Sequence, residues 1–518
     1  MAQSGRKLSF FRVMFALMLL VGLGYFSYTH FIDWEQTKKL GINTPWFAAY
    51  VDVTAEPRYA FEQLGATQGK NVILSFIVSS STDPCTPTWG NAYTIERASH
   101  ALDLERRIAR LRQQGGDIAI SFGGLLNDEL ALHCTDENSL KNAYLSVIDA
   151  YEITTIDLDL EGDSLKDWEA GVRRAKVLSE IQKEKRKKKE PLAVWVTLPV
   201  IPQGLTPEGT NAVSILLENG VDLAGVNIMT MNYGESKGDT ESLAEVSKLA
   251  MIETHRQLGI LYSQAGIYLN RSTLWTKIGI TPMIGQNDIS DEVFTVSDAK
   301  ILNSFAREKN IQRVSMWSAN RDIQCGENYV NVKVVSDSCS GITQDKLDFI
   351  VYLSEGFTGE IEANSQAETI AEAESEPIIE EDDPESSPYP IWNEDGVYLA
   401  GTKIVWKRNV YQAKWWTQGD LPDNPVLQSW QTPWQLVGPV LPGEKPLPPI
   451  TLPPGFYPEW SGSKQYNTGS RVLFEGIPYQ ARWWTQGDSP AAASLNPANS
   501  PWTPLTQRQV EQLLETTK

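Results

Sequence analysis

The sequence predicts an α/β fold, a (β/α)8 barrel, followed by two small all-β modules. Eight short apolar runs rich in β-branched residues alternate with amphipathic stretches between residues 46 and 357. This span suits such a barrel, which typically needs about 250 residues. The C-terminal part repeats itself in short copies. A doubly wound open sheet is the alternative, but no glycine-rich nucleotide loop follows the first strand.

The eight expected barrel strands are the apolar runs at 47–53, 71–78, 117–122, 155–161, 193–198, 223–229, 277–284 and 313–317. Helices are expected at 100–114 and 139–151, where apolar residues recur at three- and four-residue spacing. In such barrels the active site lies at the carboxyl ends of the strands. Catalytic residues are therefore expected where these runs end.

The fourth strand carries an unusual pattern of charge. Side chains alternate between the faces of a strand, so Asp157, Asp159 and Glu161 share one face and the intervening apolar residues share the other. Like charges at this spacing repel, and burial adds to the cost of ionising them. Such a row is typical of a metal site or of a catalytic acid whose neighbours hold its proton.

A calcium loop is the alternative for these carboxylates. It would need a bidentate glutamate at loop position twelve. Counted from Asp157, that position is Trp168, and Glu169 comes one residue late. The apolar alternation is also typical of a strand rather than of an irregular loop. The sequence therefore favours an acid–base site, and we expect neither a metal ion nor a cofactor.

Charge and histidine content exclude several other classes. Acidic residues number 65 and basic residues 45, and no basic stripe is interleaved with aromatics, so no nucleic-acid partner is expected. The basic run at 183–189 is expected to be the solvated end of a helix. Neither a metal cluster nor a Ser-His-Asp triad is supported, because the histidines are scattered at His30, His100, His133 and His255.

The N-terminal segment and the cysteines indicate the cellular compartment in which the protein is expected. Three basic residues precede an apolar run at 13–28. We expect an export signal, either cleaved or kept as an inner-membrane anchor, with the remainder secreted or on the periplasmic side. Two disulfides are expected, and the sequence leaves open which of three pairings joins Cys85, Cys134, Cys325 and Cys339.

The C-terminal part contains a gap-free internal repeat with an offset of 68 residues, in which 415–420 (WWTQGD) recurs at 483–488. Each copy has about fifty residues, so its core must be small and rich in aromatic side chains. Adjacent tryptophans on a strand point to opposite faces, so one of each pair can be buried while the other is exposed. The alternative is that all these tryptophans are core residues.

Exposed flat aromatic rings suit the apolar faces of sugars. Two weak modules on one chain gain affinity when the target is itself repetitive, which indicates a polymer. The expected binding residues are the aromatic side chains shared by the copies, namely Trp392, Tyr411, Trp415, Trp416, Trp460, Tyr479, Trp483 and Trp484.

These patterns divide the chain into seven segments. They are an export signal or anchor at 1–40, the barrel at 41–357, an acidic linker at 358–388, a first module at 389–440, a proline-rich linker at 441–455, a second module at 456–505 and a tail at 506–518.

The strand-four motif resembles the signature Asp-x-x-Asp-x-Asp-x-Glu of glycoside hydrolase family 18, the chitinase family. Its last three positions match Asp157, Asp159 and Glu161, while the first falls on Thr154. Other stretches over 46–340 resemble the bacterial and archaeal branch, namely 50–54 (YVDVT), 85–90 (CTPTWG), 121–124 (SFGG), 227–234 (NIMTMNYG), 281–288 (TPMIGQND) and 316–318 (MWS). The C-terminal copies resemble the chitin-binding modules of carbohydrate-binding family 5/12, for which WWTQG is the mark.

The resemblance implies a retaining, substrate-assisted hydrolysis of β-1,4-linked N-acetylglucosamine polymers. Glu161 would protonate the leaving oxygen, and the substrate's own 2-acetamido carbonyl would attack C1. Asp159 would accept the acetamide N–H, and Asp157 would share a proton or a charge with Asp159.

The expected substrate contacts lie at strand ends and are Trp317, Tyr233, Asn232, Met229, Gln286 and Asp52. Trp317 would form the floor under the sugar or, alternatively, belong to the core. Which residue after Met229 bonds the acetamide stays open, because Met231 occupies the place where many family members have tyrosine. Asp52 could equally be structural. Ser121 is expected to shape a turn or to bond the carboxylate row rather than act as a nucleophile.

The resulting expectation is an exported, monomeric chitinase whose partners are chitin and N-acetylglucosamine oligomers. One alternative is an enzyme with the same site that acts on N-linked glycoprotein cores. The other is a sugar-binding lectin on an inactive barrel, which the intact row of carboxylates argues against.

Overall fold

The protein is described by a computed structural model. The described residues are 44–64, 69–238, 241–329, 331, 334–361, 382–384, 386–445, 452–491, 500–505 and 507–515. The expected export segment and most of the expected acidic linker lie outside them. Within these ranges, no helix is long and apolar enough to cross a membrane. The chain forms two compact units, Met1–Glu374 and Ser375–Lys518.

The first unit is built on a closed barrel of parallel strands, as predicted. The strands are β1 (Trp46–Asp52), β2 (Asn71–Ser79), β5 (Ile118–Gly123), β6 (Thr155–Asp159), β7 (Ala193–Ile201), β9 (Leu223–Met229), β10 (Ile278–Thr281) and β13 (Arg313–Val314). Each pairs with the next in this order, and β13 pairs with β1 to close the ring. Short strands β3 (Pro87–Trp89), β4 (Tyr93–Thr94), β8 (Gly204–Leu205), β11 (Gly285–Gln286) and β12 (Val293–Phe294) extend the loops.

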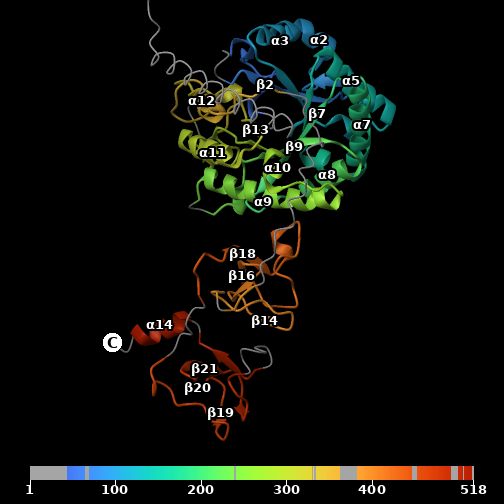
Figure 1. Cartoon of the computed structure of the whole chain (residues 1–518). Coiled ribbons are helices and arrows are strands. Elements are labelled where there is room, and N and C mark those ends of the chain that lie inside the picture. The colour runs from blue at the N-terminus through green and yellow to red at the C-terminus, as the bar shows by residue number, and fades with distance from the viewer. Residues whose placement is uncertain are drawn as a thin grey trace, which may run out of the picture. The chain divides into compact units, whose positions relative to one another are not determined.

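Helices surround these strands (Figure 1). They are α2 (Ile95–Ala101), α3 (Leu104–Gln113), α4 (Leu130–His133), α5 (Glu137–Ala150), α6 (Gly162–Lys166), α7 (Trp168–Lys187), α8 (Pro207–Glu218), α9 (Leu243–Gln264), α10 (Arg271–Thr276), α11 (Val296–Lys309) and α12 (Asp348–Ser354). The helix expected at 100–114 is instead two helices, because Asp103 adopts a left-handed conformation with φ of 49°. The basic run at 183–189 ends α7 and is largely exposed, as predicted.

Three expected strands are shorter than their apolar runs. β10 covers only Ile278–Thr281 of the run expected at 277–284. β6 ends at Asp159, and Glu161 is the residue that precedes α6. β13 ends at Val314, and beyond it Trp317 meets Met283 only as an isolated bridge. All three strands end early where the chain leaves the barrel at its carboxyl end, so the residues nearest the expected site lie just after the strands.

Both expected disulfides are present, and the pairing is Cys85–Cys134 and Cys325–Cys339. The first joins the loop between β2 and β3 to the end of α4, and the second lies in the segment that follows β13. Disulfides persist mainly in oxidising compartments, so they indicate an extracellular or periplasmic protein.

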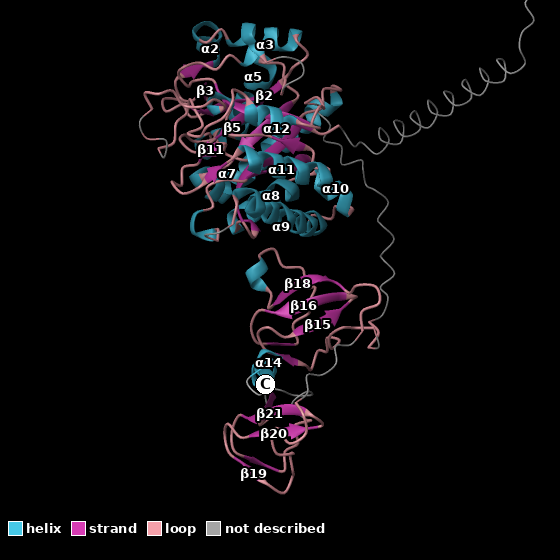
Figure 2. Ribbon diagram, turned by 90° about the vertical axis from the view of Figure 1, so that its left-hand side faces the viewer, coloured by secondary structure: helices cyan, strands magenta, loops and turns pink. Residues whose placement is uncertain are grey.

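The C-terminal unit contains two copies of one small β-fold (Figure 2). The first has β14 (Val397–Tyr398), β15 (Lys403–Trp406), β16 (Asn409–Ala413), β17 (Thr417–Gln418) and β18 (Trp434–Pro439), and the second has β19 (Gln465–Tyr466), β20 (Arg471–Phe474), β21 (Ile477–Ala481), β22 (Thr485–Gln486) and β23 (Trp502–Pro504). The strands pair in the same way in both copies. The copies therefore share a fold as well as a sequence pattern.

Each copy is organised around one buried tryptophan. Trp434 and Trp502 are 3% and 0% exposed, and each indole nitrogen donates to a backbone oxygen at 2.8 Å, that of Asp420 or Asp488. The repeated WWTQGD motif thus supplies the acceptor that a buried indole needs.

Contacts of the modules extend beyond the expected boundaries. The turn at the start of β16 donates its Lys407 and Arg408 N–H groups to Asp382, at 2.7 Å each. In the second copy, helix α14 (Gln507–Glu515) lies within the expected tail and packs Val510 against Leu473.

Candidate active site

The row of carboxylates lies at the carboxyl end of the barrel, with Asp157 and Asp159 on β6 and Glu161 just beyond its end. Asp157 and Asp159 are 0% and 6% exposed, and Glu161 is partly buried. Neighbouring strand β5 approaches this point closely, since the Gly124 N–H donates to the backbone oxygen of Asp159 at 2.9 Å. A Cβ at Gly123, whose φ is +106°, would lie 2.1 Å from that same oxygen. Glycine is therefore required beside the row.

Asp157 is held by donors from four other strands. Its Oδ1 accepts from Thr197 Oγ1 at 2.7 Å and from Arg313 Nη1 at 2.6 Å. Its Oδ2 accepts from Tyr50 Oη at 2.8 Å and from Ser121 Oγ at 2.7 Å. Ser121 thus bonds the carboxylate row, one of the two roles that the sequence suggested for it.

Asp159 has the opposite environment. Its Oδ1 is buried and has no hydrogen-bond partner among the described residues. Burial raises the pKa of Asp159 well above its ordinary value, the charges of Glu161 and Asp157 raise it further, and Arg313 opposes the rise. A buried carboxyl oxygen without a hydrogen-bond partner lowers the stability of the fold. A hydrogen-bond donor on a ligand would remove this cost, so the oxygen marks a place for a ligand contact.

Glu161 combines partial burial with a nearby carboxylate. Burial, followed by the charge of Asp288, raises the pKa of Glu161 to about 7. Asp288 is exposed on the loop after β11, and it exchanges two hydrogen bonds with Asn232 on the loop after β9 (2.7 and 3.0 Å). A carboxyl group with a pKa near neutrality is suited to act as a general acid.

Aromatic rings adjoin the carboxylates. Trp317 is partly buried, and its ring lies 6.0 Å from the ring of Tyr50 and 5.5 Å from that of Phe76, with which it is stacked. Tyr50 also bonds Asp157, so this group of rings is directly connected to the row. Trp317 thus adjoins the row and also packs against the core of the barrel, and its role as the floor under the sugar stays a prediction.

The residues expected around the acetamide are distributed differently. Met229 ends β9 and is buried. The Tyr233 hydroxyl faces away toward α9, where it shares a hydrogen bond of 3.1 Å with Ser247. The backbone N–H of Tyr233 donates to Glu292 at 3.0 Å. The structure thus joins Asn232, through Asp288, to the surroundings of Glu161, and it commits the Tyr233 hydroxyl elsewhere.

Gln286 and Asp52 make local contacts. The Gln286 amide donates to the backbone oxygens of Asn287, Ile289 and Glu292 at 3.1 to 3.2 Å, and so holds together the loop that carries Asp288. The Asp52 Oδ1 accepts from the backbone and the hydroxyl of Thr54 at 2.8 and 2.7 Å, which caps the end of β1.

The aromatic residues of the modules divide into core and surface. Tyr411 and Tyr479 are buried, and Trp392 and Trp460 are partly buried against the cores. The expectation that one member of each tryptophan pair could be buried is wrong, because all four are exposed: Trp415 43%, Trp416 53%, Trp483 41% and Trp484 55%. These pairs lie in bends just before β17 and β22, where the alternation of a strand does not apply.

A cation adjoins the first ring of each pair. Lys414 Nζ and the Arg482 guanidinium each lie 4.8 Å from the ring centre of the tryptophan that follows them. Such a cation–π contact holds an exposed ring in place. Both copies therefore present the same arrangement of two exposed indoles and one cation.

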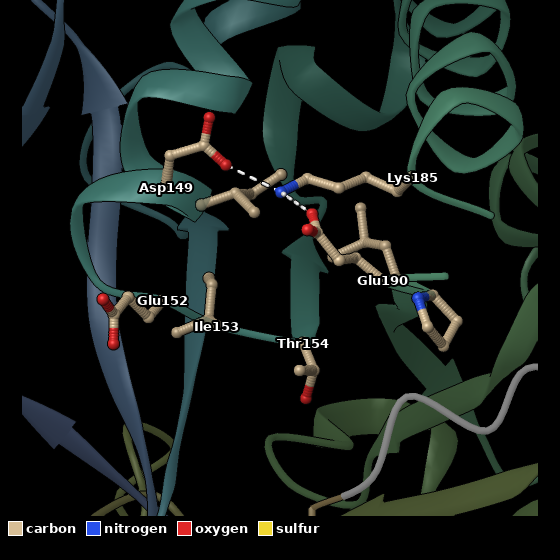
Figure 3. Close-up of a pocket in the computed structure, with 9 residues that line it drawn as sticks. Asp149, Glu152, Ile153, Thr154, Lys185 and Glu190 are labelled. Atoms are coloured by element: carbon tan, nitrogen blue, oxygen red, sulfur yellow. Dashed lines mark hydrogen bonds and ion pairs between the residues drawn. The ribbon is translucent and has the colours of Figure 1, made fainter. Parts of the chain in front are cut away.

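A separate cavity of about 310 Å³ lies at the opposite end of the barrel, where β6 and β7 begin (Figure 3). Lys185 crosses it, with its Nζ 2.7 Å from Asp149 and 3.6 Å from Glu190 (Figure 3). The lysine charge is thus already matched by two carboxylates. The cavity contains no member of the carboxylate row.

Several residues of the site were missed by the sequence reasoning, namely Tyr50, Phe76, Thr197, Asn227, Asp288 and Arg313. Tyr50 lies within the stretch 50–54 and Asp288 within 281–288, both of which were noted for their resemblance but not for these residues. The signal for Arg313 was a charged residue in an otherwise apolar strand.

Known proteins share both parts of the chain. A probable bifunctional chitinase/lysozyme of Escherichia coli is 33% identical over 332 residues, which is 61% of this chain and 35% of the relative. Endochitinase 11 of Metarhizium anisopliae is 33% identical over 307 residues, which is 57% of this chain and 56% of the relative. The chain thus aligns with about a third of the first relative and about half of the second.

A solved structure extends the likeness to the fold. The catalytic domain of a hyperthermophilic chitinase from Pyrococcus furiosus matches 61% of this chain and 97% of its own length, with a TM-score of 0.52 and 27% identity. Residues 459–503 match the sequence profile of Carbohydrate-binding module family 5/12. The barrel is therefore similar in sequence and fold to the catalytic domains of chitinases, and residues 459–503 of the second C-terminal copy match carbohydrate-binding module family 5/12.

Proposed function

We propose that this protein is an exported chitinase that hydrolyses β-1,4-N-acetylglucosamine linkages with retention of configuration. The observation that carries the proposal is the pair of buried Asp159 and partly buried Glu161, whose charges act on each other and in which the pKa of Glu161 is raised to about 7. The rings of Tyr50, Phe76 and Trp317 adjoin the same row of carboxylates. Homology of the barrel to chitinases, together with a carbohydrate-binding module on the same chain, supports chitin as the substrate.

The proposed reaction begins with protonation. Glu161 gives its proton to the glycosidic oxygen while the substrate's 2-acetamido carbonyl attacks C1, so the C1–O bond breaks and an oxazolinium ion forms. The unpartnered Oδ1 of Asp159 accepts the acetamide N–H and stabilises the developing positive charge. Water then attacks C1 and gives a proton to Glu161, while the bond between C1 and the acetamido oxygen breaks, which restores the 2-acetamido group and leaves a sugar with a free reducing end.

The aromatic floor has a supporting role. Trp317, stacked on Phe76, offers a flat apolar surface on which the sugar that becomes the oxazolinium ion rests. Asn232 and Asp288 border the mouth on the side of β9 and β11, and their mutual hydrogen bonds fix the position of the Asp288 charge near Glu161.

The C-terminal copies retain the enzyme on solid substrate. The exposed indoles of Trp415, Trp416, Trp483 and Trp484 stack on the apolar faces of chitin sugars, and the first copy binds as the second does because it shares the fold and the indole arrangement. Export by the N-terminal segment is part of the proposal and agrees with the two disulfides.

The deciding experiment measures hydrolysis of soluble N-acetylglucosamine oligomers by the wild type and by Glu161→Gln. General acid catalysis supplies roughly 10²–10⁴-fold, so the variant is expected to lose at least a hundredfold in kcat. Glu169→Gln is the matched control, since Glu169 is an exposed glutamate at the start of α7.

Equal rates for Glu161→Gln and the wild type would remove Glu161 as the acid. Oligomer binding without any turnover by the wild type would instead favour a lectin. Faster release from a glycoprotein than from chitin oligomers would favour the glycoprotein-directed alternative.

A further inference from the structure

The buried surroundings of Asp157 restrict where protons can reside in this site. A carboxylate offers about four lone-pair sites, and Asp157 accepts from four donors: Thr197, Arg313, Tyr50 and Ser121. All five side chains are at most 1% exposed. Water therefore does not compete for these hydrogen bonds, and the carboxylate is fully satisfied as an acceptor.

The directions of three of the four hydrogen bonds are constrained by their surroundings. Arg313 has only N–H groups to offer. Its Nη2 also donates to Tyr50 Oη at 2.8 Å, and Asn227 Nδ2 donates to Thr197 Oγ1 at 2.9 Å. Each of these two hydroxyls therefore already accepts one hydrogen bond, and Asp157 lies closer to each of them (2.7 and 2.8 Å) than they lie to one another (3.0 Å). Burial, followed by the charge of Asp157, raises the pKa of Tyr50, so its hydroxyl keeps the proton that it donates.

Arg313 is itself fixed in position. Its Nε donates to Ser315 Oγ at 2.9 Å. Its guanidinium lies 5.4 Å from the ring centre of Trp46 and 5.3 Å from that of Trp195. The positive charge is thus held under the row by contacts on several sides, and it lowers the pKa of Asp159 against the effects of burial and of the neighbouring carboxylates.

The charged and titratable groups that face the row come from few elements. β1 contributes Tyr50 and β13 contributes Arg313, while β5 and β7 contribute only hydroxyls to Asp157. Asp159 faces Asp157, Glu161 and Arg313, and Glu161 also faces the Asp288 charge. The row is therefore divided: Asp157 is ion-paired with Arg313, whereas Asp159 and Glu161 make no ion pair among the described residues.

We propose that Arg313 is a positioning residue that keeps the negative charge on Asp157 and so confines the catalytic proton to Asp159 and Glu161. This deepens the proposed function, on which it rests. The proton that Glu161 gives to the leaving oxygen is replaced by one from the attacking water, and in between only Asp159 can exchange a proton with it. Asp157 acts as a constant negative charge beneath the oxazolinium ion rather than as a third member of a proton relay.

The test compares pH–rate profiles of Arg313→Met, Arg313→Lys and the wild type on a soluble chitin oligomer. The acid limb reports a second proton entering the row of three carboxylates, and the charge of Arg313 opposes that entry. Loss of a nearby opposite charge shifts a pKa by about one unit or more. The acid limb of kcat in Arg313→Met is therefore expected to move up by about one pH unit.

Arg313→Lys is the matched control because it keeps the charge while losing the planar donor fork. Its limb is expected to stay within about 0.3 pH units of the wild type, whatever its kcat. A purely structural role for Arg313 would lower kcat equally at every pH and leave the limb where it was. An unmoved limb in folded Arg313→Met overturns the proposal.

Thr197→Val replaces Arg313→Met if that variant does not fold. It removes one neutral donor from Asp157 Oδ1, leaves Arg313 in place, and is expected to move the limb up by about half a unit, since hydrogen bonds to the charged form favour that form. An unmoved limb in this variant also overturns the proposal. Failure of the proposed function would look different, because the wild type itself would then show no turnover or Glu161→Gln would retain it.

Discussion

The barrel mouth and the module surfaces both depend on aromatic and polar side chains, but they use burial in opposite ways. Asp157, Tyr50 and Arg313 are almost completely buried, and their hydrogen bonds fix charges where water cannot screen them. Trp415 and Trp484 are about half exposed. Chemistry therefore depends on groups placed before the substrate arrives, whereas adhesion depends on surface left open to it.

The largest expected effect concerns a buried carboxylate in the barrel mouth. Asp159→Ala removes the unpartnered oxygen that would receive the acetamide N–H. We expect kcat on soluble oligomers to fall about 10²–10³-fold, the usual loss when an electrostatic contact to the transition state is removed. An unchanged kcat with a raised KM would show that Asp159 only binds substrate. The barrel mouth would then differ less from the module surfaces than we propose, because both would act by binding alone.

A second prediction uses stability instead of rate. The folded pKa of Glu161, about 7, lies above its ordinary value of 4.5, so ionising Glu161 costs stability as pH rises through that interval. Each unit corresponds to about 1.4 kcal/mol, so the interval allows at most about 3.5 kcal/mol, and partial exposure of Glu161 to solvent reduces this value. Glu161→Gln should therefore unfold at a higher temperature than the wild type at pH 8, and the difference should vanish at pH 4.

Denaturation curves at these two pH values check the sign. Glu169→Gln, at an exposed site, should show no such pH-dependent difference. A constant difference between Glu161→Gln and the wild type would contradict the raised pKa.

The exposed tryptophans of the two modules predict an effect on chitin retention that is separate from catalysis. Replacing all four surface tryptophans, Trp415, Trp416, Trp483 and Trp484, by alanine should weaken retention on insoluble chitin about tenfold or more, because stacking on each indole is lost. Turnover of soluble oligomers should be unchanged. Leu436→Ala, at an exposed apolar residue on β18, is the control. Loss of retention in this variant would indicate non-specific hydrophobic adsorption instead of stacking on sugars.

The smallest expected effect concerns a charge at the rim. Asp288 raises the pKa of Glu161, so Asp288→Asn should lower that pKa and move the alkaline limb of kcat to lower pH. Because Asp288 is exposed, we expect less than about one pH unit, and less still at high salt. A limb that moves the other way would show that Asp288 acts through the loop instead of through its charge.

What the sequence could predict was local. β9 has the predicted bounds because its apolar run is long and sharply bounded, and the face shared by Asp157, Asp159 and Glu161 follows from alternation alone. Alternation failed for the Trp415 pair because those residues precede a strand instead of lying in one.

What the sequence could not predict was long-range. Tyr50 and Arg313 lie 107 and 156 positions from Asp157, and only the closure of the barrel brings them together. Asp288 meets Asn232 across 56 positions for the same reason. The partner of a charged residue in an apolar strand cannot be predicted until the order of the strands in the barrel is known.

Helix α14 has a practical consequence for anyone who wishes to move the second module onto another enzyme. The recognisable carbohydrate-binding sequence stops at residue 503, yet Val510 fills a gap beside Leu473 and Leu505. A fusion protein that ends at residue 503 would expose the apolar side chain of Leu473 to water and would be prone to aggregate. The transplantable piece is therefore longer than the motif by which it is found, and should include residues 507–515.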